Sequence, residues 1–233
     1  MLLINNLSFS RNETKIFENL NLSLSNKKII QIKGRNGSGK TTFLKVILNI
    51  LEPNNGEVIW KGKNIKKNIF DFYNQTTFIM DNNTSTRELS VEDNINFWRG
   101  LSSSKLNNEE IFELLNKLNI EKYYKTKVMY LSSGERKKLE LIRLILEQKR
   151  LWVLDEPFNH LDDLSVEILN QTFLDHINND GIIILDDYKL KGWWNDGVTK
   201  AIDYFIDAKK IKILNCHNLF NYHHQCILQK FES

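Results

Sequence analysis

The stretch that most constrains this chain is "GRNGSGKTT", which follows the apolar run "KIIQIK". Gly34 to Thr41 fits the pattern G-x-x-x-x-G-K-[ST] at each specified position. Such a loop turns several backbone N–H groups inward around a phosphate, and glycine adopts the required dihedral angles at little cost. The loop then leads into a helix, whose N-terminus attracts anions. The sequence therefore predicts a nucleotide-binding loop, and the alternative of a glycine-rich turn that binds nothing is disfavoured by this context.

The predicted contacts with the nucleotide follow the loop residue by residue. The Lys40 ammonium group should reach the β- and γ-phosphates, and the Thr41 hydroxyl should hold Mg²⁺. The complete set of predicted nucleotide-binding residues is Gly34, Arg35, Asn36, Gly37, Ser38, Gly39, Lys40, Thr41 and Thr42. A loop of this kind could belong to a kinase, a GTPase or an ATPase, so the rest of the chain must discriminate among these classes.

Hydrophobic patterning places the loop in an α/β fold. Apolar residues recur at helical spacing from Thr41 as far as Leu51. The runs "LWVLD" and "GIIILD" are apolar throughout, as strands covered on both faces are. "LLINNLSFS" and "IFENLNLSLS" alternate like half-exposed strands, while residues 90–147 have a mostly helical pattern. We predict a parallel α/β sheet with a helical insertion.

The composition excludes several classes of protein. Hydrophobic residues at 41% and charged residues at 26% are ordinary globular values. The net charge of +3 is too weak to indicate a nucleic-acid partner, because Lys and Glu are interspersed. No apolar stretch approaches the roughly 20 residues that span a bilayer, and the N-terminus lacks the build of a signal peptide. We expect a soluble chain that reaches a membrane only through partners, and its two cysteines make no disulfide framework.

Two further motifs carry acidic or small polar residues. "LWVLDEP" brings Asp155 and Glu156 to the C-terminal end of a predicted strand, where ligands collect in parallel sheets. Asp155 would hold the magnesium shell, and Glu156 would orient and deprotonate the attacking water. Alone, this motif could equally be a polar turn after a buried strand. "LSSGE" opens a helix, and its Ser132 and Glu135 could also form a capping box that any helix might use.

Together these motifs resemble the nucleotide-binding subunits of ATP-binding cassette (ABC) transporters. "LSSGE" is similar to that family's signature LSGGQ, "LDEP" to its second nucleotide motif, and "NHLD" (159–162) to its D-loop. The resemblance runs from the N-terminus to about Tyr188 and implies a P-loop NTPase with a mixed sheet core, N-terminal antiparallel β strands and a helical subdomain. It implies ATP and Mg²⁺ as cofactors, integral membrane transporter subunits as partners, and a homodimer that sandwiches two ATP molecules. Residues that would then contact ATP held by the partner chain are Ser132, Ser133, Gly134 and Glu135.

A narrower resemblance concerns "GEVIWKG", "LWVLDEPF" and the segment that begins at Arg11. These are similar to the ATP-binding subunits of heme exporters in cytochrome c maturation. That resemblance implies ATP use linked to the release of heme from a carrier protein across the membrane. It also implies a peripheral location on an inner membrane, on the bacterial cytoplasmic side or the mitochondrial matrix side.

The sequence departs from the family at two positions. Where the family has a Gln that touches Mg²⁺, only Asn82 or Asn83 is available, and Asn has the shorter reach. Where the family has His after the last core strand, this chain has Tyr188, which can donate only one neutral hydrogen bond. The neighbouring Asp186 and Asp187 would add unfavourable negative charge near a triphosphate.

These departures set the predicted roles. We assign Glu156 and Tyr188 to catalysis and Thr41, Asp155 and Asn82 to Mg²⁺, and we expect slower hydrolysis than in a member with the His. One alternative is a nucleotide-switched regulatory or assembly subunit with weak or no turnover, and another is the ATPase of a different small ABC exporter. A soluble phosphotransferase is disfavoured because "LSSGE" precedes "LDEP".

The predicted domain organisation is one ABC ATPase domain over residues 1–188, with a helical subdomain at about 84–147. Residues 189–233 form a C-terminal extension of unclear role. A zinc site is conceivable in this extension, but the spacing fits no common pattern and chance gathering is favoured. The residues concerned are Cys216, His217, His223, His224 and Cys226.

Overall fold

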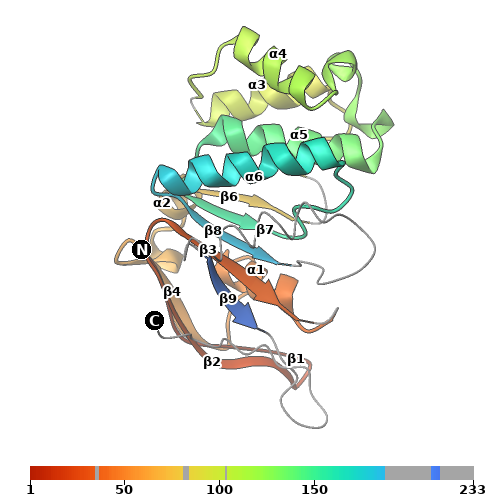
Figure 1. Cartoon of the computed structure of the whole chain (residues 1–233). Helices are drawn as coiled ribbons and strands as arrows, with labels where there is room; N and C mark the ends of the chain where they lie inside the picture. The colour runs from red at the N-terminus through yellow and green to blue at the C-terminus, as the bar shows by residue number, and fades with distance from the viewer. Residues whose placement is uncertain (35–36, 81–83, 103, 187–210, 216–233) are drawn as a thin grey trace.

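The computed structural model describes residues 1–34, 37–80, 84–102, 104–186 and 211–215 of the 233-residue chain. Figure 1 shows the elements stacked in layers, with helices above a parallel sheet and antiparallel strands below it. The sequence pattern already implies this separation, because strands that are apolar throughout need cover on both faces.

The antiparallel sheet is built from the N-terminal half of the chain. Its strand order is β2-β1-β4-β5. The strands are β1 (Leu2–Arg11), β2 (Thr14–Leu24), β4 (Asn55–Trp60) and β5 (Lys63–Asn64). Burial alternates along β1 and over Leu20 to Leu24 of β2, as the period of two in a strand requires when only one face meets the core. The half-exposed strands predicted from alternation are confirmed.

The second sheet is parallel and carries the candidate site. Its order is β6-β7-β8-β3-β9, and every pairing in it is parallel. The strands are β3 (Lys28–Lys33), β6 (Thr76–Ile79), β7 (Leu151–Leu154), β8 (Ile182–Asp186) and β9 (Ile211–Asn215). All residues of β7 and β8 are buried, as predicted from their uninterrupted apolar runs.

The helices divide into two groups by the face that they cover. Helix α1 packs between the two sheets, where the Phe43 ring meets Phe17 of β2 edge-on at 5.5 Å. Helices α3 to α6 lie above the parallel sheet in Figure 1, and their buried side chains form a second core cluster with it. The helices are α1 (Lys40–Ile47), α2 (Ile69–Tyr73), α3 (Val91–Ser102), α4 (Asn108–Lys117), α5 (Ser133–Glu147) and α6 (Asp163–Asn178). Short 3₁₀ turns lie at η1 (Ile65–Lys67), η2 (Glu121–Tyr123) and η3 (Val128–Tyr130).

The structure differs from the sequence expectation at the end of α1. Apolar spacing predicted a helix as far as Leu51, but α1 ends at Ile47. Asn49 adopts a φ of 55°, in the left-handed region, which stops the helical hydrogen-bond pattern one turn early. Leu48 is nevertheless fully buried, so the apolar periodicity reports packing beyond the end of the helix.

Strand β9 adds something that the sequence pattern did not indicate. It lies within residues 189–233 and pairs in parallel with β3, with Ile29 opposite Ile211. This part of the predicted extension therefore belongs to the core sheet, while the predicted division at residue 188 stays a prediction. The Cys and His residues of the extension, and Asp187, lie outside the described residues.

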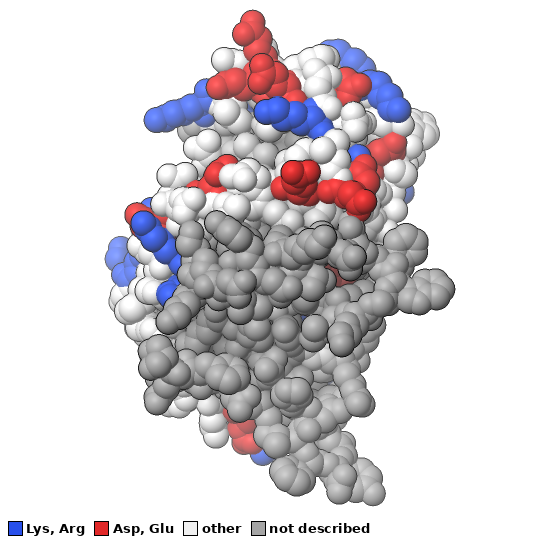
Figure 2. All heavy atoms as spheres, viewed as in Figure 1, with Lys and Arg blue, Asp and Glu red and all other residues white. Residues whose placement is uncertain are grey.

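The surface and the helices bear on the expected partners. On the face drawn in Figure 2, basic side chains are interspersed with acidic ones over the upper helices. No helix among the described residues combines the length and the apolar character that crossing a bilayer requires. The described residues also contain no group of three His, Cys, Asp or Glu that could hold a metal ion.

Candidate nucleotide-binding site

The phosphate loop joins the C-terminal end of β3 to the N-terminus of α1. Gly37 has a φ of 79° and Gly39, the N-cap of α1, has a φ of 96°. A Cβ atom on Gly39 would lie 2.3 Å from Ile16 Cγ2, so both conformation and space require glycine there. Arg35 and Asn36 lie outside the described residues. The loop therefore has the backbone conformation that its motif predicts where it is described.

Polar side chains of the loop meet a second strand end. Lys40 is 5% exposed and its Nζ donates a hydrogen bond to the Gly34 carbonyl at 3.1 Å, which keeps the ammonium group against the loop. Thr41 Oγ1 donates to Asp155 Oδ1 at 3.2 Å. The structure thus brings together two of the three residues predicted for Mg²⁺, and a hydroxyl beside a carboxylate is a ligand set that suits this ion. Asn82 lies outside the described residues.

The predicted general base occupies a strained turn directly after β7. Glu156 has a φ of 47°, which is unusual for a residue with a side chain. Its backbone N–H donates to Asp186 Oδ1 at 2.8 Å, and its carboxylate accepts a hydrogen bond from the Asn159 side-chain amide. Two side chains therefore hold the backbone and the carboxylate of Glu156 in place.

Sequence reasoning missed the role of Asp186. Asp186 is 2% exposed and its carboxylate accepts from the Glu156 backbone N–H, while its expected negative charge near a triphosphate stays a prediction. The available signal was its position, because an Asp that ends a fully buried strand lies at the edge where the ends of β7 and β8 meet. Tyr188, the other predicted catalytic residue, lies outside the described residues.

The stretch "LSSGE" opens α5 as expected. Ser132 is the N-cap: its Oγ accepts from the Glu135 N–H at 3.2 Å, and Glu135 Oε2 accepts from the Ser132 N–H at 2.7 Å. The capping-box alternative is therefore realised, and it leaves Ser132 and Ser133 exposed. A Cβ atom on Gly134 would lie 2.8 Å from the His160 carbonyl, so this glycine allows the signature to pack against the D-loop stretch.

A salt bridge joins α5 to the same D-loop stretch. Lys138 Nζ lies 2.6 Å from Asp162 Oδ2, and Asp162 Oδ1 accepts from the Ser165 N–H at 2.9 Å as the cap of α6. Burial opposes ionisation of Asp162, but these hydrogen bonds outweigh it and lower its pKa to about 2. Within one chain, this salt bridge therefore holds the helix that follows the signature against the D-loop stretch.

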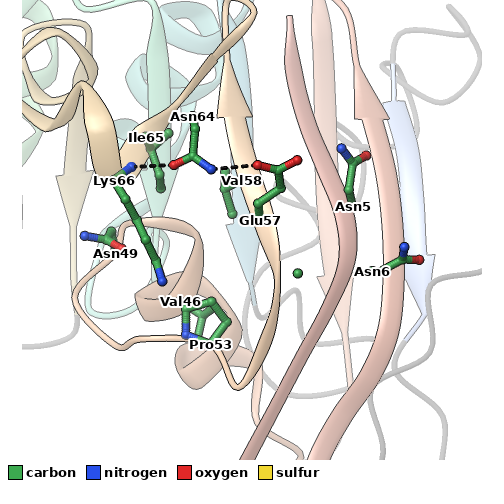
Figure 3. Close-up of a pocket in the computed structure, with 11 residues that line it drawn as sticks. Asn5, Asn6, Val46, Asn49, Pro53, Glu57, Val58, Asn64, Ile65 and Lys66 are labelled. Carbon is green, nitrogen blue, oxygen red and sulfur yellow. Dashed lines mark hydrogen bonds between the residues drawn. The ribbon is translucent and has the colours of Figure 1, made fainter.

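A separate pocket of about 480 Å³ lies at the other end of α1 (Figure 3). It is lined from α1 and the turn after it by Val46 and Asn49, and across from them Asn64 donates to Glu57 at 2.6 Å. The anion-attracting N-terminus of α1 is at the opposite end of the helix, so this pocket is not the predicted phosphate site. The predicted nucleotide site therefore rests on the loop motif and not on the size of this pocket.

Comparison with known proteins identifies the family. Residues 17–159, more than half of the chain, match the family model described as ABC transporter. This chain belongs to the ABC transporter ATP-binding proteins. It has the ABC ATPase fold predicted from the resemblance, and it is an ATP-binding, ATP-hydrolysing subunit of an ABC transporter.

Curated relatives of this ABC ATPase cover nearly all of its length. The cytochrome c biogenesis ATP-binding export protein CcmA of Vibrio vulnificus is 32% identical over 212 residues, which is 91% of this chain and 97% of the relative. The protein of the same name from Vibrio cholerae is 34% identical over 185 residues, covering 79% of this chain and 89% of the relative. These relatives are bacterial, so they give the mitochondrial alternative no support.

Solved structures agree with the fold of the ABC ATPase. A putative ABC transporter ATP-binding protein from Pyrococcus furiosus superposes with a TM-score of 0.69 at 27% identity, covering 82% of this chain and 93% of that one. A dimeric ATP-binding cassette bound to ADP and phosphate superposes with a TM-score of 0.69 at 18% identity, covering 81% and 88%. The second likeness concerns the fold alone.

Proposed function

We propose that this chain is the ATPase of a cytochrome c biogenesis exporter and works on the bacterial cytoplasmic side of the inner membrane. The observation that carries the proposal is the 32% identity that spans 97% of a relative named for cytochrome c biogenesis export. The Thr41–Asp155 contact supports it, because the hydroxyl and carboxylate expected beside Mg-ATP are adjacent. The cargo step would be linked to heme, as the sequence resemblance implies.

The chain's own residues would act on ATP in distinct ways. The loop amides and Lys40 would bind the phosphates, and Thr41, Asp155 and Asn82 would hold Mg²⁺, which when bound neutralises charge on the phosphates. Glu156 would orient the attacking water and accept its proton, with its turn held by Asp186. Tyr188 would donate a neutral hydrogen bond toward the γ-phosphate, a weaker interaction than that of a charged His.

Two copies of the chain would be needed for a complete site. Ser132 and Ser133 are exposed at the start of α5, and the N-terminus of a helix attracts anions. In the proposed homodimer, the Ser132–Glu135 stretch of one chain would contact the ATP held by the loop of the other. Two Mg-ATP would then be sandwiched between the copies.

The helical layer supplies a surface for the integral membrane partner. Phe97 and Leu101, 55% and 65% exposed, share a face of α3 because they are four residues apart. An open groove of about 690 Å³ beside the 45%-exposed Phe112 is lined by the acidic side chains of Glu109 and Glu113 on α4 and by Glu92 of α3, which pairs with Lys125. Cytoplasmic loops of membrane proteins are enriched in Lys and Arg, which complements this groove. We therefore expect a basic, partly apolar loop of the membrane subunit to dock on this surface.

A second candidate function is a nucleotide-switched regulatory or assembly subunit with little turnover. The departures at Asn82 and Tyr188 favour it, because both weaken contacts with the reacting phosphate. Steady-state ATPase measurement on the chain purified with its membrane partners separates the two. Glu156→Gln should lower turnover by about 10²-fold or more while ATP binding persists, since a general base contributes about 10²–10⁴-fold. Glu167→Gln, an exposed acid on α6, is the matched control and should leave turnover unchanged.

The cargo assignment needs its own measurement. Integral membrane proteins that co-purify with the chain are identified, and ATP-dependent release of heme from its carrier is followed by absorbance. Release that requires ATP and stops in Glu156→Gln would support the proposal. ATP turnover without heme release would assign the chain to another small ABC exporter.

A further inference from the structure

Glu140 is an acidic residue with no exposed surface near the middle of α5. Burial of an ionised carboxylate is costly unless donors satisfy it, and removing the donors leaves the charge stranded. An apolar residue at this position of α5 would avoid that cost. The partners of Glu140 therefore indicate what this residue holds in place.

Arg143 Nη1, on the same helix, lies 4.0 Å from Glu140 Oε2, and both hydrogen-bond donors to Glu140 come from one short segment. Glu140 Oε1 accepts from the Ser85 backbone N–H at 2.8 Å, and Glu140 Oε2 accepts from Thr84 Oγ1 at 2.5 Å. Ser85 is itself 6% exposed, so water does not compete strongly for this bond. One carboxylate thus binds two successive residues of the segment that connects β6 with α3.

Arg143, three residues further along α5, contacts the same segment. It donates to Thr84 Oγ1, whose single hydroxyl can accept this bond while it donates to Glu140. The guanidinium lies 6.0 Å from the ring centroid of Phe78 and 5.7 Å from that of Trp98, so its position is also constrained by packing.

A second buried carboxylate provides an internal comparison. Glu147 accepts from Arg143 Nε at 2.7 Å and from Thr77 Oγ1 at 2.6 Å. It is 8% exposed and lies on the same helix, but it bonds to β6 itself and, among the described residues, makes no hydrogen bond with the segment after the strand. Glu140 and Glu147 therefore share a helix and an arginine while they hold different parts of the chain.

The segment held by Glu140 leaves the strand beside the candidate site. β6 ends at Ile79, whose carbonyl accepts from the Asp155 N–H at 2.8 Å. At the other end of the link, α5 begins at the signature stretch, and Glu140 is about 12 Å along the axis from Ser132 at 1.5 Å per residue. Because a helix transmits displacement along its length, a shift at Glu140 also moves Ser132 and Gly134.

We propose that Glu140 is a positioning residue for the nucleotide-sandwich dimer. It fixes α5 against the segment that leaves β6, so that Ser132 and Gly134 meet the ATP of the partner chain in the correct place. The inference rests on the proposed homodimer and goes beyond it, because it assigns a dimer-specific task to a residue that touches neither nucleotide. Binding of ATP by a single chain, which depends on the loop at Lys40, should not need Glu140.

The test compares dimer formation with binding to the monomer. The full-length chain carries Glu156→Gln so that bound ATP is retained, and dimerisation is followed by analytical ultracentrifugation over a range of Mg-ATP concentrations. Affinity of the monomer is measured at low protein concentration with a fluorescent ATP analogue. Glu140→Gln should need about tenfold more ATP for half-maximal dimerisation, with monomer affinity within twofold of the parent. Glu147→Gln should leave both quantities within twofold.

Thr84→Val provides a second variant if Glu140→Gln folds poorly. It removes one donor to the carboxylate and should shift dimerisation severalfold in the same direction. Dimerisation of Glu140→Gln at the parent's ATP concentration would overturn the inference, and so would an equal shift in Glu147→Gln, which would indicate general loosening of α5. Failure of the parent to bind ATP or to dimerise would instead overturn the proposed function.

Discussion

The hydrogen bond from the Glu156 backbone to Asp186 makes a quantitative prediction. Glu156 is in the left-handed region, which costs a residue with a side chain about 1–2 kcal/mol. A hydrogen bond to a charged group contributes about 1.5–3 kcal/mol, so the 2.8 Å bond to the buried Asp186 can offset this strain. Asp186→Ala should therefore destabilise the chain by about 2 kcal/mol and reduce the population of the competent turn about 30-fold.

Steady-state ATPase measurement of the complex with its membrane partners tests this reasoning. In Asp186→Ala, kcat should fall at least tenfold while KM for ATP stays within twofold, because Lys40 and Thr41 are untouched. Asp186→Asn keeps an acceptor oxygen, so its kcat should lie between that of Asp186→Ala and that of the unchanged chain. Asp175→Asn, an exposed acid on α6, controls for loss of charge. Urea unfolding of the same proteins measures the stability change.

A competing account predicts the opposite sign. If Asp186 acted mainly as a repulsive charge near the triphosphate, Asp186→Asn would bind ATP more tightly and hydrolyse it faster. Unchanged or increased turnover in Asp186→Ala would refute the positioning role. The two accounts thus differ in direction as well as in size.

Three further results are expected. Gly39→Ala should abolish ATP binding and lower stability, because its Cβ would lie 2.3 Å from Ile16 Cγ2 at a φ of 96°. Adding Ile16→Ala to this variant should restore little ATP binding, because the backbone strain remains. Burial against Trp152 lowers the pKa of His176 from 6.5 to about 4, so the unfolded chain alone takes up a proton as pH falls through this window. Unfolding free energy should then fall by about 3 kcal/mol between these pH values, at about 1.4 kcal/mol per pKa unit, and His176→Gln should remove that part of the dependence in urea titrations. Tyr188→His should raise ATP turnover of the assembled complex, and equal turnover before and after the change would refute the expected role of this departure.

The parts of the site that could be predicted from sequence are local in the chain. The backbone conformation of the phosphate loop requires glycine at fixed spacings, so the motif alone predicts phosphate binding. Strands β7 and β8 were recognisable because cover on both faces demands an apolar residue at every position. The D-loop and signature stretches were recognisable only through their resemblance to the family, since their composition is ordinary for turns and helix starts.

The contacts that could not be predicted join residues far apart in the chain. Asp186 meets the Glu156 backbone, and Glu140 meets Thr84 and Ser85, only because the sheet and α5 bring them together. From the pattern alone, Asp186 is a polar residue after an apolar run and Glu140 is a charge on an amphipathic helix. Neither pattern distinguishes a solvated charge from a buried one that organises its neighbours.

The order of the parallel sheet has a consequence for biosynthesis. Strand β3 carries the phosphate loop, yet both of its neighbours, β8 and β9, are made about 150 or more residues later in translation. In a nascent chain, the strand that precedes the phosphate loop therefore leaves the ribosome long before its neighbours in the sheet, and such distant pairings form slowly. If the ribosome paused before residue 211, the apolar strand β3 would lack its edge partner β9. Such an intermediate would be prone to aggregate and would depend on chaperones.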